Sequence, residues 1–330
     1  MPRLTFDVTD ALVGERIDRA LAALLEDRNL SRKHAKALVE RGLVHHNKRA
    51  CRRASTRLER GDTVSVESNV LPKPGAGEGD QEKDPNQPAR QTLITAAHIL
   101  FEDDDLILVN KPSGLPSHAT RDPNRAHLLG ALTSFLYWRH VDAGNAPLKP
   151  YIALHHRLDV DTSGVMALAK SRRANKGLMK VFQERMALKT YTALCALPHE
   201  AIPEVVENHL GEERVAKGRV RMIDVRSGGD YARTELKILQ EMENIAVIQA
   251  RPHTGRRHQI RAHLSQVGAP ILGDVLYDGV DHLLGVRFTR VMLHASALEL
   301  PHPISGELVR ASVEPDEAWM RTLERFSGAK

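Results

Sequence analysis

Residues 71–91, LPKPGAGEGDQEKDPNQPARQ, constrain the fold of this chain more than any other stretch. They include four Pro, three Gly and no aromatic residue. Such a segment cannot bury enough apolar surface to fold alone. The GAGEG within it is not a nucleotide-binding loop, because no strand precedes it and no helix follows. We therefore predict a flexible linker over 71–92, an N-terminal domain over 1–70 and a second domain over 93–330.

Length and composition agree with this division. At 330 residues the chain is too long for one typical domain and long enough to bury a large core. Its two cysteines, Cys51 and Cys195, allow no disulfide framework, which indicates a reducing compartment. The N-terminal residues contain no apolar run typical of a signal peptide, and no window approaches a membrane span. We expect a soluble, cytoplasmic protein.

The N-terminal domain concentrates positive charge. Eleven Lys or Arg lie between Arg28 and Arg60, against two Glu, although the whole chain has a net charge of only +5. Apolar residues at helical spacing predict one helix over 17–25 and a second over 35–39, with Ser31 as its N-cap and Gly42 as its end. Short strands with an Arg-rich turn are expected after residue 42, ending in the alternating TVSV of 63–66.

This charge has two interpretations. A charge run is often a solvated surface, but a compact unit with its cations on one side is typical of RNA binding. Arg32 and Lys36 lie one helical turn apart, and Arg52 and Arg53 occupy the turn. The unit over about 14–67 resembles the alpha-L RNA-binding module. That resemblance implies that these four cations contact RNA phosphates.

The second domain mixes strands and helices. LILV at 106–109 and VMALAK at 165–170 predict buried strands, and further strands are expected in KTYTALCAL, RTELKIL and NIAVIQARP. Helices are expected after Ser171 and within RRHQIRAHLSQVG, which follows the last of these strands. Because the order lacks regular β-α-β alternation, we predict an α+β fold with a mixed, mostly antiparallel sheet.

One polar segment breaks the pattern of packed elements. HHRLDVDTSG, residues 155–164, places Asp159 and Asp161 between cations and a buried strand. It is not an aspartic-protease loop, since Ser163 separates Thr162 from Gly and no second copy exists. Adjacent histidines without supporting spacing do not indicate a metal site, and the Gly-x-Ser-x-Gly of serine hydrolases is absent. The alternative to a functional acid is a carboxylate that caps backbone amides.

A second segment supplies a partner for this acid. In the helix predicted after residue 255, Ile260 and Leu264 form a buried stripe, with Arg261 at its boundary. A cation there is costly unless it meets a carboxylate, and Asp159 is a suitable one. An Asp paired with Arg stays ionised and could serve as a nucleophile or as an electrostatic stabiliser.

Six ordered motifs now point to a family. LVNKPSGLPSH, HRLDVDTSG, KTYTAL, TGRRHQIRAHL, APILGDVLY and VMLHASALELPHP resemble the RluA-type RNA pseudouridine synthases over about residues 95–315. The resemblance implies a pseudouridine synthase fold, uridine isomerisation in RNA, and no cofactor or metal. It further implies that Asp159 is catalytic, that Tyr191 stacks on the base or exchanges a proton with it, and that Arg261 pairs with Asp159.

The remaining polar residues of these motifs are expected to bind substrate. They are His156, Arg157, Thr162, Lys189, Arg256, His258 and Gln259. The expected partner is structured RNA. We expect large-subunit ribosomal RNA as the substrate, with transfer RNA as the alternative. A non-catalytic RNA-binding or ribosome-assembly protein on the same scaffold is the alternative function, and the presence of Asp159 favours the enzyme. We expect a monomer.

Overall fold

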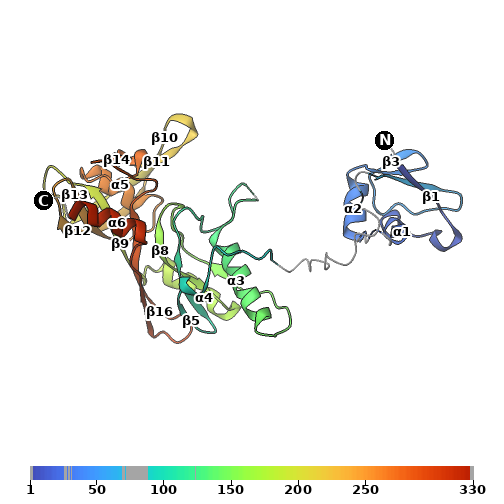
Figure 1. Ribbon diagram of the computed structural model, residues 1–330, viewed down its shortest axis with the longest axis horizontal. Helices are drawn as coiled ribbons and strands as arrows, with labels where there is room; N and C mark the ends of the chain where they lie inside the picture. The colour runs from blue at the N-terminus through green and yellow to red at the C-terminus, as the bar shows by residue number, and fades with distance from the viewer. Residues whose placement is uncertain are drawn as a thin grey trace. The chain divides into compact units, whose positions relative to one another are not determined.

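The structure is a computed structural model that describes residues 3–25, 28, 30, 32–68, 71, 88–122 and 124–327. The chain forms two compact units, Met1–Pro85 and Asn86–Lys330 (Figure 1). Ser31, the expected helix cap, and residues 72–87 of the expected linker lie outside the described residues. Each unit has its own core, and we describe each by itself.

The first unit is a small α+β domain. Its sheet has the strand order β1-β4-β2-β3. Its elements are β1 (Arg3–Asp7), α1 (Ile17–Leu24), α2 (Arg32–Glu40), β2 (Val44–His46), β3 (Arg49–Cys51) and β4 (Thr63–Glu67). The two predicted helices and the strand at 63–66 are confirmed, whereas β1 is an additional strand that the sequence patterns above do not predict.

The core of this unit comes from the apolar stripes of its two helices. Ile17 and Leu21 of α1 pack with Ala35 and Val39 of α2, and all four are buried. Gly42 ends α2 as expected: its φ is +75°, and the next N–H, from Leu43, bonds to Leu38 O at 3.0 Å. The local sequence therefore determines where both helices lie.

The second unit is built on one large sheet. The path of the sheet is β11-β10-β12-β13-β9-β16-β8-β6-β5, with β17 beside β16 and β7 beside β8. Its strands are β5 (Ile99–Glu102), β6 (Leu106–Lys111), β7 (Ala153–Leu154), β8 (Ser163–Ala169), β9 (Leu188–Ala196), β10 (Val205–Arg214), β11 (Val220–Asp224), β12 (Asp230–Glu241), β13 (Ile245–Pro252), β16 (Leu293–Pro301) and β17 (Leu308–Ser312).

The predicted α+β architecture is confirmed. Among the described strands of this sheet, β16 and β8 pair in parallel and all other pairs are antiparallel. The parallel junction needs Gly164, because a Cβ there would lie 2.2 Å from the backbone oxygen of Ala295. This close approach connects β8 with β16 at the last residue of the HRLDVDTSG segment.

Helices also accompany the sheet in the described part of this unit (Figure 1). They are α3 (Leu128–Asp142), α4 (Arg172–Gln183), α5 (Gln259–Gln266) and α6 (Glu317–Ser327). Ser171 caps α4 as predicted, its hydroxyl oxygen accepting the N–H of Ala174 at 3.1 Å. The sequence patterns above predict neither α3 nor α6. Apolar residues such as Leu129 and Phe135 extend around α3 beyond its buried stripe, so the helix lacks a strong contrast between two faces.

The end of the expected linker contacts the second unit. Trp138 Nε1 donates to Pro88 O at 3.1 Å, and the Ser134 hydroxyl donates to Ala89 O at 2.8 Å. The Arg90 guanidinium lies 4.8 Å from the centre of the Trp138 ring. The composition of residues 88–91 does not reveal these contacts, because the polar and aromatic groups that make them come from α3.

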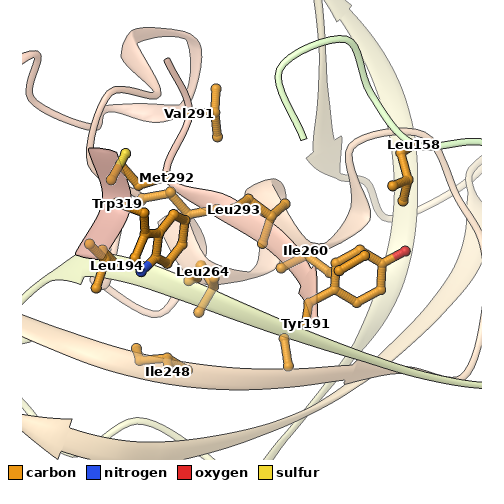
Figure 2. Close-up of a cluster of buried hydrophobic side chains, with 14 of the residues drawn as sticks. Leu158, Tyr191, Leu194, Ile248, Ile260, Leu264, Val291, Met292, Leu293 and Trp319 are labelled. Atoms are coloured by element: carbon orange, nitrogen blue, oxygen red, sulfur yellow. The ribbon is translucent and has the colours of Figure 1, made fainter. Parts of the chain in front are cut away.

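The main core of the second unit lies between the sheet and its helices. In Figure 2, Trp319 of α6 lies beside Leu194 and Met292, while Tyr191 lies at the other end of the group near Leu158 and Ile260. In this view the Tyr191 hydroxyl lies at the end of the ring nearest to Leu158. No helix in the described part of the chain is both long and apolar enough to cross a membrane.

Candidate active site

Asp159 lies in the loop between β7 and β8, and a neighbouring loop holds its backbone. The Ser117 hydroxyl donates to Leu158 O at 2.8 Å and accepts the Leu158 N–H at 3.1 Å. Lys111, at the end of β6, is fully buried, and its Nζ donates to Val160 O at 3.0 Å. These bonds hold the backbone on both sides of Asp159 and thereby fix the loop that carries it.

Lys111 also organises the loop that follows it. Its Nζ donates to Pro112 O at 2.9 Å and to Leu115 O at 2.8 Å. Burial lowers the pKa of Lys111 to about 7. The three carbonyl oxygens match the three donors of an ammonium group, and they thereby connect the 112–115 turn to the Asp159 loop.

The Asp159 carboxylate is 22% exposed and has two basic neighbours. Its Oδ2 lies 3.3 Å from Arg261 Nη1 and 3.8 Å from His258 Nε2. Arg261 comes from the first turn of α5, and His258 is the residue that precedes that helix. The carboxylate therefore faces cationic and polar groups from a segment about one hundred residues further along the chain.

Arg261 makes its shorter bonds to a different acid. Its Nε and Nη2 donate to Asp274 at 2.6 and 2.7 Å, and Asp274 is almost completely buried. The Tyr277 ring lies 4.9 Å from the Arg261 guanidinium. Although burial opposes the charge, the hydrogen bond from Arg261 to Asp274 and the negative charges of Asp274 and Asp159 raise the pKa of Arg261. Arg261 is therefore a permanent cation with a fixed position.

Asp274 and Tyr277 are functional candidates that the sequence interpretation did not single out. Both belong to the APILGDVLY motif, Asp274 directly before the 3-10 helix η6 (Val275–Tyr277) and Tyr277 at its end. The available signal was the same one that suggested Asp159, because a buried Arg requires a carboxylate. Asp274 is 13 residues away in sequence and would have satisfied the requirement as well as Asp159.

His258 precedes α5 and contacts Tyr277. It has a left-handed backbone with φ of 52°, so α5 begins at Gln259 rather than earlier in the predicted segment. The Tyr277 hydroxyl oxygen accepts the Met222 N–H at 2.6 Å and lies 3.0 Å from His258 Nδ1. Burial lowers the pKa of His258 to about 4. Nε2, the other ring nitrogen, faces Asp159 Oδ2 at 3.8 Å.

Tyr191 lies on β9 at the boundary between the core and the site (Figure 2). It is buried, and this burial together with the Asp159 charge raises the pKa of its phenol. The hydroxyl therefore stays protonated at neutral pH. Lys189, two residues earlier on the same strand, has its pKa lowered by burial and by the charge of Arg185.

Two of the expected substrate-binding residues, His156 and Gln259, also bond to neighbouring groups of the protein. His156 Nε2 accepts the Ala167 N–H at 2.9 Å, its ring stacks on Phe182 with centroids 4.2 Å apart, and burial lowers the pKa of His156 to about 3. The Gln259 amide is buried and bonds to the hydroxyls of Thr254 and Thr234. These bonds tie the segment before Asp159 to β8 and the start of α5 to β12.

The remaining candidates differ in exposure. Thr162 is buried and Arg157 is exposed. Arg256 is partly buried, and its Nε donates to Tyr231 O at 3.0 Å. All ten candidate residues of the second unit line one cavity of about 460 Å³: His156, Arg157, Asp159, Thr162, Lys189, Tyr191, Arg256, His258, Gln259 and Arg261.

The four cations proposed for RNA contact belong to the first unit. Arg32 and Lys36 are about half exposed on α2, and Arg52 and Arg53 are exposed in the turn after β3. Arg32 Nε lies 3.9 Å from Asp18 and Lys36 Nζ lies 3.6 Å from Glu40, so both form only long contacts with acids. The unit thus presents cations to solvent from two of its elements.

The comparisons with known proteins identify the family. A family model for RNA pseudouridylate synthases matches residues 105–266. The chain is 32% identical to ribosomal large subunit pseudouridine synthase D of Zymomonas mobilis, over 95% of this chain and 94% of that protein. It is 30% identical to ribosomal large subunit pseudouridine synthase C of Escherichia coli K12, over 98% and 96%.

Solved structures agree. The human RNA pseudouridylate synthase domain containing 4 matches with a TM-score of 0.56 and 27% identity, covering 70% of this chain and 93% of that one. The segment that the family model matches includes both Asp159 and Arg261. The fold, the ordered motifs and these relatives together show that the chain belongs to the RluA-type RNA pseudouridine synthases.

Proposed function

We propose that this enzyme isomerises specific uridines of large-subunit ribosomal RNA, with Asp159 as its catalytic residue. The observation that carries the proposal is the Asp159 carboxylate, open to the cavity and 3.3 Å from the Arg261 guanidinium. The relatives named as ribosomal large subunit synthases, which align over almost the whole chain, support the choice of RNA.

The reaction requires an ionised carboxylate, whether that group acts as a nucleophile or as an electrostatic stabiliser. The bond between N1 of uracil and C1′ of ribose breaks, the base turns, and a bond forms between C5 and C1′. A proton leaves C5 and N1 carries one in the product, so the atoms balance without an oxidant or a reductant. Asp159 acts as a nucleophile or as a stabiliser of positive charge at the reacting carbon, and in both cases the Arg261 guanidinium lies 3.3 Å from its carboxylate.

Tyr191 is better suited to hold the base than to accept its proton. Burial and the Asp159 charge raise the pKa of its phenol, so the phenolate that could accept a proton is disfavoured. A cavity of about 460 Å³ is within the range of ordinary ligand sites. A uridine in a duplex must leave its stack to enter this cavity, at a cost of about a few kcal/mol that stacking and phosphate contacts offset.

The N-terminal unit is proposed as an RNA-docking module. Its exposed cations Arg32, Lys36, Arg52 and Arg53 supply phosphate contacts that position RNA without reading its sequence. The chemistry and the specificity for a given uridine then lie in the second unit. This division predicts that the two units fail in different ways when mutated.

The test is a map of pseudouridines in cellular RNA with and without the gene. We expect the deletion to remove pseudouridine at specific positions of large-subunit ribosomal RNA. The wild-type gene should restore them and Asp159→Asn should not, while RNA affinity of that variant stays within about tenfold because the side chain keeps its shape. Asp161→Asn, at the exposed acid two residues away, is the matched control and should restore modification.

Other outcomes would change the proposal. Positions lost only from transfer RNA would assign the other substrate. Measurable turnover by Asp159→Asn on a verified RNA would remove the catalytic role from Asp159. If no pseudouridine depends on the gene while the protein still binds RNA, the alternative of a non-catalytic RNA-binding protein holds.

A further inference from the structure

A second cavity, of about 510 Å³, lies next to the active-site cavity. The two cavities share Arg185, Ala187, Pro252 and His253 as lining residues. The second one extends from the connection between α4 and β9 to the first residues of β12 and the end of β13. A ligand in the active site can therefore continue into it without leaving the surface of the protein.

Apolar side chains are exposed around this second cavity. Met186 is 50% exposed, Leu188 43% and Tyr231 37%. The Tyr231 ring has His209 beside it, edge to face with centroids 5.9 Å apart. This contact restricts the ring while leaving a substantial part of it open. Exposed apolar and aromatic groups gathered around one hollow are typical of a binding surface.

The charges at this cavity divide into two kinds. Arg233 and His253 each have an acidic partner, since Arg233 bonds to Glu207 at 2.6 Å and His253 Nε2 lies 2.7 Å from Glu235. Arg185 and Arg251 are exposed and make no ion pair with any residue that the structure describes. Guanidinium groups bind phosphates, and an aromatic side chain stacks on a base. The two groups of this cavity therefore suit the two parts of a nucleotide.

We propose that the second cavity binds the nucleotide that flanks the target uridine in the RNA strand. Its base packs on Tyr231 and Met186, and Arg185 and Arg251 contact its phosphates. This inference rests on the proposed function, because the occupant is the next residue of the strand that enters the active site. Continuity with that site and the available cations favour RNA over a peptide as the occupant.

The protein side of the test uses the full chain and an RNA fragment that carries a uridine whose modification depends on the gene. Tyr231→Ala and Arg251→Ala should each raise KM by about tenfold and leave kcat within about twofold, because they remove ground-state contacts away from the reacting atoms. Leu239→Ala and Lys237→Ala are matched controls on β12. Leu239 is 48% exposed and Lys237 is exposed, both lie outside the cavity, and neither change should alter KM.

The RNA side of the test removes one base at a time next to the target uridine. For the wild type, one abasic position should raise KM about as much as Tyr231→Ala does. In Tyr231→Ala the same abasic position should cause no further loss, since the base and its platform act as a unit. Thermal unfolding of each variant checks that the fold is intact.

The outcomes separate the two proposals. If no RNA depends on the gene for pseudouridine, the proposed function fails and this inference fails with it. If wild-type turnover is normal but KM of Tyr231→Ala and Arg251→Ala is unchanged, only the cavity assignment fails. That second result would be expected if the cavity received a protein instead, because naked RNA would not detect it. The assignment would also fail if, at every abasic position, the increase in KM added to the increase caused by Tyr231→Ala.

Discussion

Asp274 holds Arg261 by two short hydrogen bonds, 2.6 Å to Nε and 2.7 Å to Nη2, and leaves Nη1 for the longer contact with Asp159. The buried acid satisfies one edge of the guanidinium in a bidentate geometry. The cation that faces Asp159 is therefore held in place from behind. Asp159 can change its charge or its partner during a reaction without releasing Arg261.

The first prediction follows from this arrangement. Asp274→Asn should destabilise the second unit by about 3–5 kcal/mol, because it leaves a buried guanidinium without its carboxylate. It should also lower kcat. Asp159→Asn should cost far less stability, since Arg261 keeps both bonds to Asp274. Urea unfolding measures the stability of the two variants, and turnover at saturating RNA measures kcat.

Two further variants complete this comparison. Glu299→Gln breaks the pair with Arg310, an Arg that is 69% exposed, and should cost less than about 1 kcal/mol. Arg261→Met should destabilise or inactivate the enzyme, since it leaves both Asp159 and Asp274 without the cation. If Arg261→Met kept full activity and stability, Arg256 would be the next candidate for the partner of Asp159.

The second prediction concerns acid. Burial lowers the pKa of both His258 and His263 to about 4, below the value of about 6.5 in an unfolded chain. Between these values the unfolded state binds more protons, so the stabilisation is complete above about pH 6.5 and is lost as the pH falls toward 4. Each histidine should reduce the free energy of unfolding by about 2 kcal/mol between pH 7 and pH 5.

Urea unfolding at the two pH values measures this loss. In His263→Gln the free energy of unfolding should fall by about 2 kcal/mol less between pH 7 and pH 5 than in the wild type. This holds whatever the variant does to stability at pH 7. His199→Gln, at an exposed position, is the control and should leave the decrease unchanged. An identical pH dependence in wild type and His263→Gln would show that His263 is not neutral in the folded protein.

The third prediction concerns where the second unit begins. A chain starting at Asn86 keeps the contacts of residues 88–91 with Ser134 and Trp138 on α3 and should unfold at the same temperature as the second unit of the full chain. A chain starting at Thr92 loses these contacts and should unfold at a lower temperature. Equal melting temperatures for the two truncated chains would show that the contacts contribute nothing to stability.

The fourth prediction separates docking from chemistry. Replacing Arg32, Lys36, Arg52 and Arg53 together with Ala should weaken RNA binding and make it less dependent on salt, by about one unit of the log–log slope for each lost phosphate contact. Turnover at saturating RNA should persist. The chain starting at Asn86 should behave in the same way. An unchanged salt slope in both proteins would mean that this basic surface is only solvated.

The sequence by itself determined much of this protein. The Pro- and Gly-rich stretch indicated two folded parts, helical stripes located α1, α2 and α4, and Ser171 and Gly42 marked helix ends. These signals are local, because they depend on residues a few positions apart. The ordered motifs indicated the family, which the relatives confirm.

Only the tertiary structure decided which groups meet. Asp159 and Asp274 were equally suitable partners for Arg261 in sequence, and the fold gives Arg261 two bonds to Asp274 and one to Asp159. Polar residues in a motif could line the cavity, bond to the protein or do both, and His156 and Gln259 do both. The contacts of Pro88 and Ala89 with α3 were equally hidden. Such choices depend on packing between distant segments, which no local pattern encodes.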